Sequence, residues 1–298
     1  MRANIPEYEM LSPKTLTEAL AKLKAEPGIW KPFAGGTDLM VLFEAGKLAH
    51  KRFINIWGLG DLKKSQETSQ HLTLGALTTY SDLQKHPIIQ KEFPILVHSS
   101  FETGAVAIQN RGTLGGNIAN ASPAADSSPG LLVYDADIQL ISEEGSRWVK
   151  YRQFHTGYKK TVMRVDELIH AVRLPRATLG AQHYFKKVGT RKAQAISKVC
   201  FAAVAWMEEL KSEGSSFKSK IKQLRIALGS VGPTVLACPK TEAFLTGKDL
   251  SAQKSGWLEQ ARKIFISEIA PIDDIRSNAE YRLEVSANLL EDFLGTLQ

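Results

Sequence analysis

The N-terminal part of the chain combines short apolar runs with helical spacing. Leu16, Leu20 and Leu23 recur every three to four positions, which is the spacing of one buried face of an α-helix. This spacing predicts a helix within 12–28, with Pro13 in its first turn and Ser12 as its N-cap. The other apolar segments predict strands at 7–11 and 52–59, and a strand, a glycine turn and a helix within 29–46.

The middle of the chain mixes alternating and helical patterns. Residues 71–83 begin with strand-like alternation and then become helical, and a helix is expected within 86–104. Two alternating segments around Gly145 predict a hairpin over 135–154. An apolar strand is expected over 166–175, where Pro175 stops it.

The pattern changes after Pro175. Residues 175–181 have the composition of a linker, and the apolar segments across 183–210 and 220–238 predict three strands. Helical spacing then predominates, within 240–247, 255–269 and 278–294. Strands followed by helices are typical of an α+β domain, so we expect a second domain to begin near residue 178.

Composition limits the class of protein. The chain has 298 residues, 43% of them apolar and 23% charged, which suggests two folded domains. The net charge is +7. The lysines and arginines are scattered along the chain, with a denser basic patch at 185–194, and they form no nucleic-acid-binding motif. This patch is either ordinary solvated surface or a surface for docking or for an anionic ligand. No apolar run is long enough to span a membrane and no signal core opens the chain, so we expect a cytoplasmic protein.

Two cysteines, Cys200 and Cys238, are too few for a disulfide framework or an iron–sulfur cluster of the chain's own. Both have apolar neighbours, which favours buried, unreactive thiols. The histidines form no metal-binding motif, and no nucleophile motif of a hydrolase is present. The sequence therefore gives no indication of a metal enzyme or a hydrolase.

The first candidate site is the segment "KPFAGGTDLM". Two glycines and a threonine stand between an expected strand and an expected helix. Glycine lets main-chain N–H groups approach an anion closely, and the threonine adds a hydroxyl donor. The pattern fits a phosphate cradle, but a Gly-Gly turn between a strand and a helix more often has a purely structural role.

The second candidate site, "RGTLGGN", repeats the theme within a long run of small residues, 109–129. Two cradles suit a ligand with two phosphates, which favours a dinucleotide. Neither segment matches the Rossmann fingerprint or the P-loop. The following residues, "ANASPAAD", leave room for a broad ring system beside the main chain. Asp126 either accepts hydrogen bonds from ribityl or ribose hydroxyls or caps the next helix.

These segments, together with "GYKKTVMRVDELIHAVRLP", resemble the FAD-binding subunits of the molybdenum hydroxylases, the family that includes xanthine and carbon monoxide dehydrogenases. The resemblance spans nearly the whole chain. It implies an α+β, two-subdomain FAD-binding domain of the vanillyl-alcohol-oxidase-like (PCMH) type at 1–177, with subdomains of about 1–57 and 58–177. An α+β C-terminal domain, a three-stranded sheet plus helices, would follow at 178–298.

The resemblance also implies the cofactor-binding residues. One pyrophosphate loop would be Lys31, Pro32, Phe33, Ala34, Gly35, Gly36, Thr37 and Asp38, and the other would be Thr113, Leu114, Gly115, Gly116 and Asn117. Asp126 would hydrogen-bond FAD, Ile169 would pack near it, and Lys186 would lie near the flavin. The alternatives are a core strand residue for Ile169 and a surface lysine for Lys186.

The implied function is electron transfer by an FAD-dependent oxidoreductase subunit of an enzyme that acts on CH or CH2 groups, with xanthine as the first expectation for the substrate. A molybdopterin-binding large subunit and an iron–sulfur small subunit would be the partners, and NAD⁺ or another acceptor would take the electrons. The chain lacks the cysteine-rich insert that some members carry. A self-sufficient FAD oxidoreductase and a non-enzymatic binding protein with vestigial loops are the alternatives.

Overall fold

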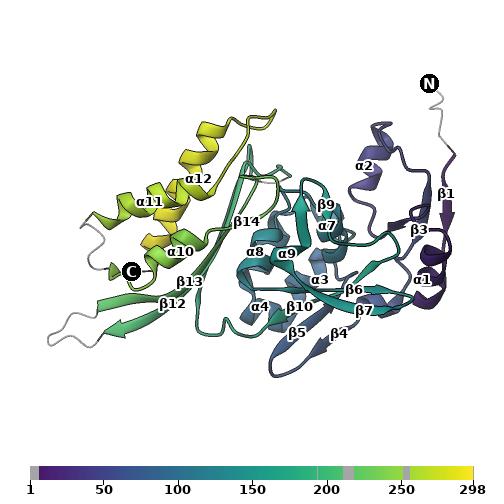
Figure 1. Cartoon of the computed structure of the whole chain (residues 1–298), viewed down its shortest axis with the longest axis horizontal. Helices are drawn as coiled ribbons and strands as arrows, with labels where there is room; N and C mark the ends of the chain where they lie inside the picture. The colour runs from purple at the N-terminus through teal and green to yellow at the C-terminus, as the bar shows by residue number, and fades with distance from the viewer. Residues whose placement is uncertain (1–6, 193, 211–217, 251–255, 298) are drawn as a thin grey trace.

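The computed structural model describes residues 7–192, 194–210, 218–250 and 256–297. It is an α+β protein with three main sheets that follow one another along the long axis of the molecule (Figure 1). The N-terminal sheet is parallel and has the order β1-β3-β2. Its elements are β1 (Glu9–Leu11), α1 (Leu16–Ala25), β2 (Lys31–Phe33), α2 (Leu39–Glu44) and β3 (Arg52–Asn55).

Helix α1 forms where the leucine spacing predicts it, but its expected cap was wrong. Thr15, not Ser12, is the N-cap, and its hydroxyl accepts a hydrogen bond from the N–H of Glu18 at 3.1 Å. The Thr-x-x-Glu order is a capping-box signature that places the helix start three residues later than the expected cap. Leu20 and Leu23 are buried on the predicted face.

The middle sheet has the order β4-β5-β10-β6-β7 and all its pairs are antiparallel. The predicted hairpin around Gly145 is confirmed, since β6 pairs with β7 and Gly145 has a φ of 136°. The strands are β4 (Ser65–Glu67), β5 (His71–Gly75), β6 (Asp137–Ser142), β7 (Gly145–Lys150) and β10 (Leu168–Pro175), preceded by the 3-10 helix η1 (Gly60–Lys63). A small hairpin joins β8 (His155–Gly157) to β9 (Lys160–Thr161).

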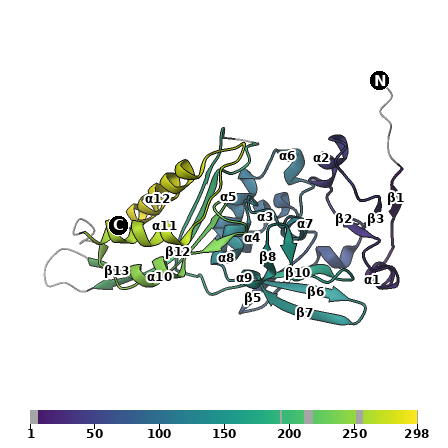
Figure 2. The same ribbon diagram turned by 45° about the horizontal axis from the view of Figure 1, so that its top comes forward.

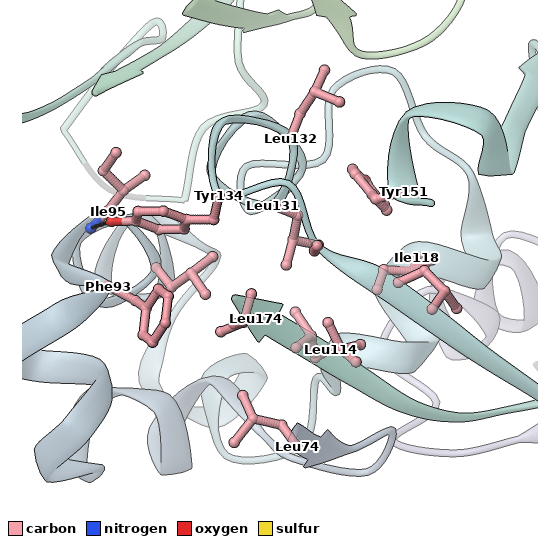
Figure 3. Packing of buried hydrophobic residues seen from close by; sticks show 14 of the residues in the cluster. Leu74, Phe93, Ile95, Leu114, Ile118, Leu131, Leu132, Tyr134, Tyr151 and Leu174 are labelled. Atoms are coloured by element: carbon pink, nitrogen blue, oxygen red, sulfur yellow. Dashed lines mark hydrogen bonds between the residues drawn. The ribbon is translucent and has the colours of Figure 1, made fainter. Parts of the chain in front are cut away.

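Short helices cover one face of this sheet. The helix expected within 86–104 is divided at Phe93, because Pro94 begins a second helix. The helices are α3 (Tyr80–Lys85), α4 (Pro87–Glu92), α5 (Pro94–Glu102), α6 (Val106–Gln109), α7 (Leu114–Asn120), α8 (Ser128–Val133) and α9 (Tyr151–Phe154). Leu114 and Ile118 of α7 point into the core shared with Leu174 of β10 (Figure 3).

The C-terminal part is an antiparallel sheet, β11-β12-β13-β14, with helices on one face (Figure 2). Three strands were expected, and β14 is a fourth, short one. The elements are β11 (Gln182–Val188), β12 (Val199–Leu210), β13 (Lys218–Gly229), β14 (Leu236–Ala237), α10 (Pro239–Leu245), α11 (Trp257–Glu268) and α12 (Ala279–Thr296).

The two faces of this sheet pack against different cores. Phe201 and Ala203 of β12 belong to the cluster formed with α11 and α12, whereas Ala202 and Val204 belong to the cluster of the middle part. Both thiols, Cys200 and Cys238, are buried. None of the helices described is long and apolar enough to cross a membrane.

Candidate functional site

The two glycine segments meet in space. A Cβ on Gly35 would stand 1.7 Å from the carbonyl oxygen of Arg111 and 2.6 Å from its carbonyl carbon. Only a residue without a side chain allows this approach. Gly35 lies in the turn after β2 and Arg111 in the segment before α7, so the contact joins the two parts of the chain that were expected to hold a diphosphate.

The first segment leaves consecutive main-chain N–H groups without acceptors among the described residues. Gly36 has a φ of 77°, and a Cβ there would be 2.4 Å from the ring of Phe33. In the described chain, no residue accepts a hydrogen bond from the N–H groups of Gly35, Gly36, Thr37 or Asp38. Consecutive free N–H groups around a left-handed residue make a concave anion site, called a nest. We call residues 35–38 the nest.

The second segment differs from the expectation of a matching cradle. The N–H groups of Leu114 and Gly115 donate to Thr78 and Ala76 oxygens at 2.9 and 2.8 Å. Those of Gly116 and Asn117 donate to the hydroxyl and carbonyl oxygens of Thr113, at 3.1 and 2.9 Å. Tertiary contacts and the helix cap therefore use the main-chain donors of residues 114–117, whereas the N–H of Thr113 has no acceptor among the described residues. Contact of this segment with a diphosphate stays a prediction.

The second segment packs closely against the turn after β5 and keeps one free side-chain donor. A Cβ on Gly115 would be 2.6 Å from the Cβ of Ala76, so this glycine lets α7 lie close to the turn after β5. Outside the backbone of its own helix, a Cβ on Gly116 would have only the Thr113 hydroxyl within 4 Å. The Asn117 oxygen accepts from Ser127 at 2.9 Å, and its amide NH₂ has no partner among the described residues. Asn117 can therefore donate to a ligand.

Asp126 lies at the junction with the C-terminal sheet. It is 9% exposed, and its carboxylate bonds the ammonium of Lys187 at 2.8 Å and the hydroxyl of Ser197 at 2.5 Å. Burial raises the pKa of the Asp126 carboxyl, and Lys187 opposes this effect. The cap alternative is wrong, because α8 begins after Ser127 and has no side-chain cap.

Lys186 and Lys187 point to opposite faces of β11. Lys186 pairs with Phe201, on the face that carries the C-terminal helices, and it is exposed. Lys187 pairs with Cys200 on the other face, and its side chain is only 4% exposed. The structure thus brings Lys187, which sequence reasoning missed, to Asp126, and leaves Lys186 away from the site. Adjacent lysines in a strand differ only by register, which the sequence does not state.

The remaining predicted residues belong to the first glycine segment or to the core. Lys31 is exposed on β2, next to Pro32, Phe33 and Ala34. Ile169 is 5% exposed and belongs to the middle core, opposite Leu140 and beside a β-bulge. The strand-core alternative describes its packing, and contact with a cofactor stays a prediction.

A groove of about 560 Å³ lies elsewhere, on the outer face of the middle sheet. Asp61, His170 and Arg173 are among its lining residues, and none of the predicted site residues is. The nest and the groove are therefore separate features. Within the described residues, no group of three or more His, Cys, Asp or Glu side chains could hold a metal ion. What the nest can do is bind an anionic group.

Known proteins resemble the chain over nearly its full length. The sequence profile of the family "FAD binding domain in molybdopterin dehydrogenase" matches residues 6–177, and that of the "CO dehydrogenase flavoprotein C-terminal domain" matches 183–297. The chain is 29% identical to the putative xanthine dehydrogenase FAD-binding subunit of Escherichia coli strain K12, covering 91% of this chain and 89% of the relative. It is 29% identical to the glyceraldehyde dehydrogenase medium chain of Sulfolobus acidocaldarius, covering 94% of each.

A solved structure agrees with these relatives. A chain of carbon monoxide dehydrogenase from Hydrogenophaga pseudoflava superposes with a TM-score of 0.86 at 26% identity, and the match covers 96% of each chain.

Proposed function

Since the chain belongs to the molybdenum hydroxylase flavoproteins, whose FAD-binding domain matches residues 6–177, we propose that it carries electrons through FAD bound at the nest. The proposal rests on the four free main-chain N–H groups of residues 35–38. They begin at Gly35, whose Cβ position lies against the carbonyl group of Arg111. The residues fit the pyrophosphate of FAD, because the nest offers donors to an anion and a Cβ on Gly36 would disturb it.

The chain's own residues bind and orient the cofactor. We expect the nest to hold the pyrophosphate, Asn117 to donate its amide hydrogens, and Asp126 to accept from hydroxyl groups of FAD. Asp126 is held in place by Lys187 and Ser197. Bound FAD supplies the transfer of one or two electrons, which no side chain of this site provides.

The electron donor lies outside this chain. Cys200 and Cys238 are both buried, and an iron–sulfur cluster needs about four thiolates, so the described chain cannot hold one. We propose that an iron–sulfur subunit delivers electrons to FAD, that a molybdopterin subunit oxidises the substrate, and that NAD⁺ accepts the electrons. The relatives' names contain the words "subunit" and "medium chain", which supports an assembly.

The oxidised substrate is a finer proposal. Xanthine and glyceraldehyde dehydrogenase chains are equally similar to this one, at 29% identity. We propose a xanthine-like heterocycle, whose CH group would be hydroxylated on the molybdopterin subunit. Activity of the whole assembly on xanthine, compared with glyceraldehyde and carbon monoxide, tests this choice, and turnover of only an alternative would refute it.

Flavin content tests the proposed function. The full chain, purified alone and also co-expressed with its partner subunits, should show flavin absorbance and release about one FAD per chain on denaturation. Gly36→Ala should lose FAD, because φ at this residue is 77° and lies in the nest. Gly46→Ala is the matched control, because Gly46 also has a positive φ of 67°, but nothing lies within 4 Å of its Cβ position. A colourless chain that takes up no FAD in either preparation would refute the proposal.

A further inference from the structure

The main chain that leads into Asp126 is held by the C-terminal part of the chain. The N–H of Ser230, directly after β13, donates to the oxygen of Pro123 at 2.8 Å. A Cβ on Gly229 would be 3.2 Å from the same oxygen, so the two main chains lie close together. Three residues further on, Lys187 binds the Asp126 carboxylate. The C-terminal sheet therefore fixes both the side chain of Asp126 and the main chain before it.

Ser230 has an uncommon conformation. Its φ is 68°, in the left-handed region that residues other than glycine rarely adopt. Such a conformation persists where the surrounding contacts impose it. The N–H of Ser230 bonds Pro123, and its oxygen accepts a hydrogen bond from Nη1 of Arg282 at 2.7 Å. Both main-chain polar groups of Ser230 are thus occupied, one by the segment before Asp126 and one by α12.

The position of Arg282 is not explained by the stability of its own helix. The side chain is buried in the first turn of α12, where a cation is unfavourable because the N-terminus of a helix is itself positive. Nη2 donates to Asp274 at 2.6 Å, which compensates the charge. Burial would raise the pKa of Asp274, but hydrogen bonds from the Arg276 N–H and the Arg282 guanidinium hold it below its ordinary value. The ion pair therefore leaves Nη1 for the Ser230 oxygen.

We propose that Arg282 is a positioning residue of the FAD site, which fixes the main chain before Asp126 through Ser230. Two hydrogen bonds in series connect the guanidinium to Pro123, and Arg282 acts without touching the cofactor. This inference rests on the proposed function, in which Asp126 accepts hydrogen bonds from FAD. Because hydrogen bonds weaken steeply with distance and angle, a small displacement of this segment should weaken FAD binding.

A purely structural role is the competing explanation. In that case Arg282 would only join α12 to the turn that contains Asp274, and its loss would lower stability without affecting FAD. Arg262 supplies the matched comparison, because it also joins two elements of the C-terminal part. It lies on α11, and its hydrogen-bond partners among the described residues all belong to α12: Glu284, Asn288 and Glu291.

FAD titrations of the full chain, freed of flavin, separate the two explanations. Arg282→Met should weaken FAD binding about tenfold and change the visible circular dichroism of the bound flavin. Arg262→Met should also lower the free energy of unfolding, but it should leave FAD affinity within about twofold of the wild type and the flavin spectrum unchanged. Urea unfolding of each variant ensures that only folded protein is titrated.

Two substitutions of Ser230 test the same link, and they also serve if Arg282→Met does not fold. Ser230→Gly keeps both main-chain hydrogen bonds and adopts a positive φ without strain, so FAD affinity should stay within about twofold of the wild type. Ser230→Val places a β-branched residue at this φ and should reproduce the tenfold loss and the spectral change.

Equal FAD affinities in Arg282→Met and Arg262→Met, with the same flavin spectrum, would overturn the inference and leave the proposed function intact. A Ser230→Val chain that binds FAD as tightly as the wild type would overturn it as well. A wild-type chain that binds no FAD would instead overturn the proposed function, and the inference with it.

Discussion

The Cβ position of Gly35 lies 1.7 Å from the carbonyl oxygen of Arg111. The main chains of the nest and of the second glycine segment are therefore in direct contact. Arg111 also stacks over the ring of Trp57 at 3.8 Å, which connects its side chain to the N-terminal part as well. The candidate site is thus built at a junction between two parts of the chain. The predictions below test this junction and the contacts around it.

Gly35→Ala should force the two segments apart. The neighbouring atoms belong to the main chain and cannot rotate away, so we expect a loss of stability on the order of 2 kcal/mol or more and loss of FAD retention. Gly58→Ala is the control, since nothing lies within 4 Å of its Cβ position and it is in the same part of the chain. Urea unfolding and flavin content measure both effects. Unchanged values for Gly35→Ala would mean that the segments do not meet in solution.

Gly115→Ala should lower the free energy of unfolding through a steric clash with Ala76. Its Cβ would stand 2.6 Å from the Cβ and 2.8 Å from the oxygen of Ala76, which accepts the Gly115 N–H. We expect a loss of about 1 to 3 kcal/mol from overpacking. Gly295→Ala, in helix α12 with open space around it, should instead stabilise by about 0.5 to 1 kcal/mol. Thermal unfolding, monitored by circular dichroism, compares the two variants. The same shift of melting temperature in both would contradict the packing of α7.

Lys187→Met should be far more damaging than Lys186→Met. The first change leaves the buried Asp126 carboxylate without its cation, which costs about 3 to 5 kcal/mol for a buried pair. Lys186 is exposed on the other face, so its loss should change stability by less than about 0.5 kcal/mol. FAD titration of both variants also tests the original expectation for Lys186. A loss of FAD affinity in Lys186→Met alone would restore that residue to the site.

Acidification should destabilise the junction between the middle core and the C-terminal sheet. The Tyr134 hydroxyl accepts from the N–H of Ile95 and shares a hydrogen bond with Nδ1 of His183, both at 3.1 Å (Figure 3 shows Tyr134 and Ile95). Burial lowers the pKa of His183, so folding favours its neutral ring. A lowered histidine pKa contributes stability that is present above the unfolded value of about 6.5 and is lost as pH falls through the folded value.

The measurement is urea unfolding at about pH 8 and about pH 5, on either side of the ordinary histidine pKa. The wild type should lose stability at the lower pH, and His183→Phe should lose less of it. His155 also has a pKa lowered by burial, so part of the pH dependence should persist in the variant. An identical pH dependence in both proteins would show that His183 remains unprotonated over this range or does not couple to folding.

Several elements could be predicted because their signals are local. The leucine spacing of α1, the hairpin around Gly145 and the change to helices after residue 240 each follow from periodicity within one segment. The cap of α1 was also within reach, because Thr15 and Glu18 have capping-box spacing. The division at Phe93 is similarly local, since Pro94 follows it.

By itself, the sequence determined where glycine and small residues interrupt the elements, and with them the family and the expected diphosphate site. Only the tertiary structure decided which main-chain donors are free, because Ala76 and Thr78 take those of Gly115 and Leu114 while those of the nest have no acceptor in the described chain. It also decided that Lys187 faces Asp126 and Lys186 does not. The physical reason is that residue type and spacing are properties of one segment, whereas hydrogen-bond partners and strand register depend on segments far apart in the chain.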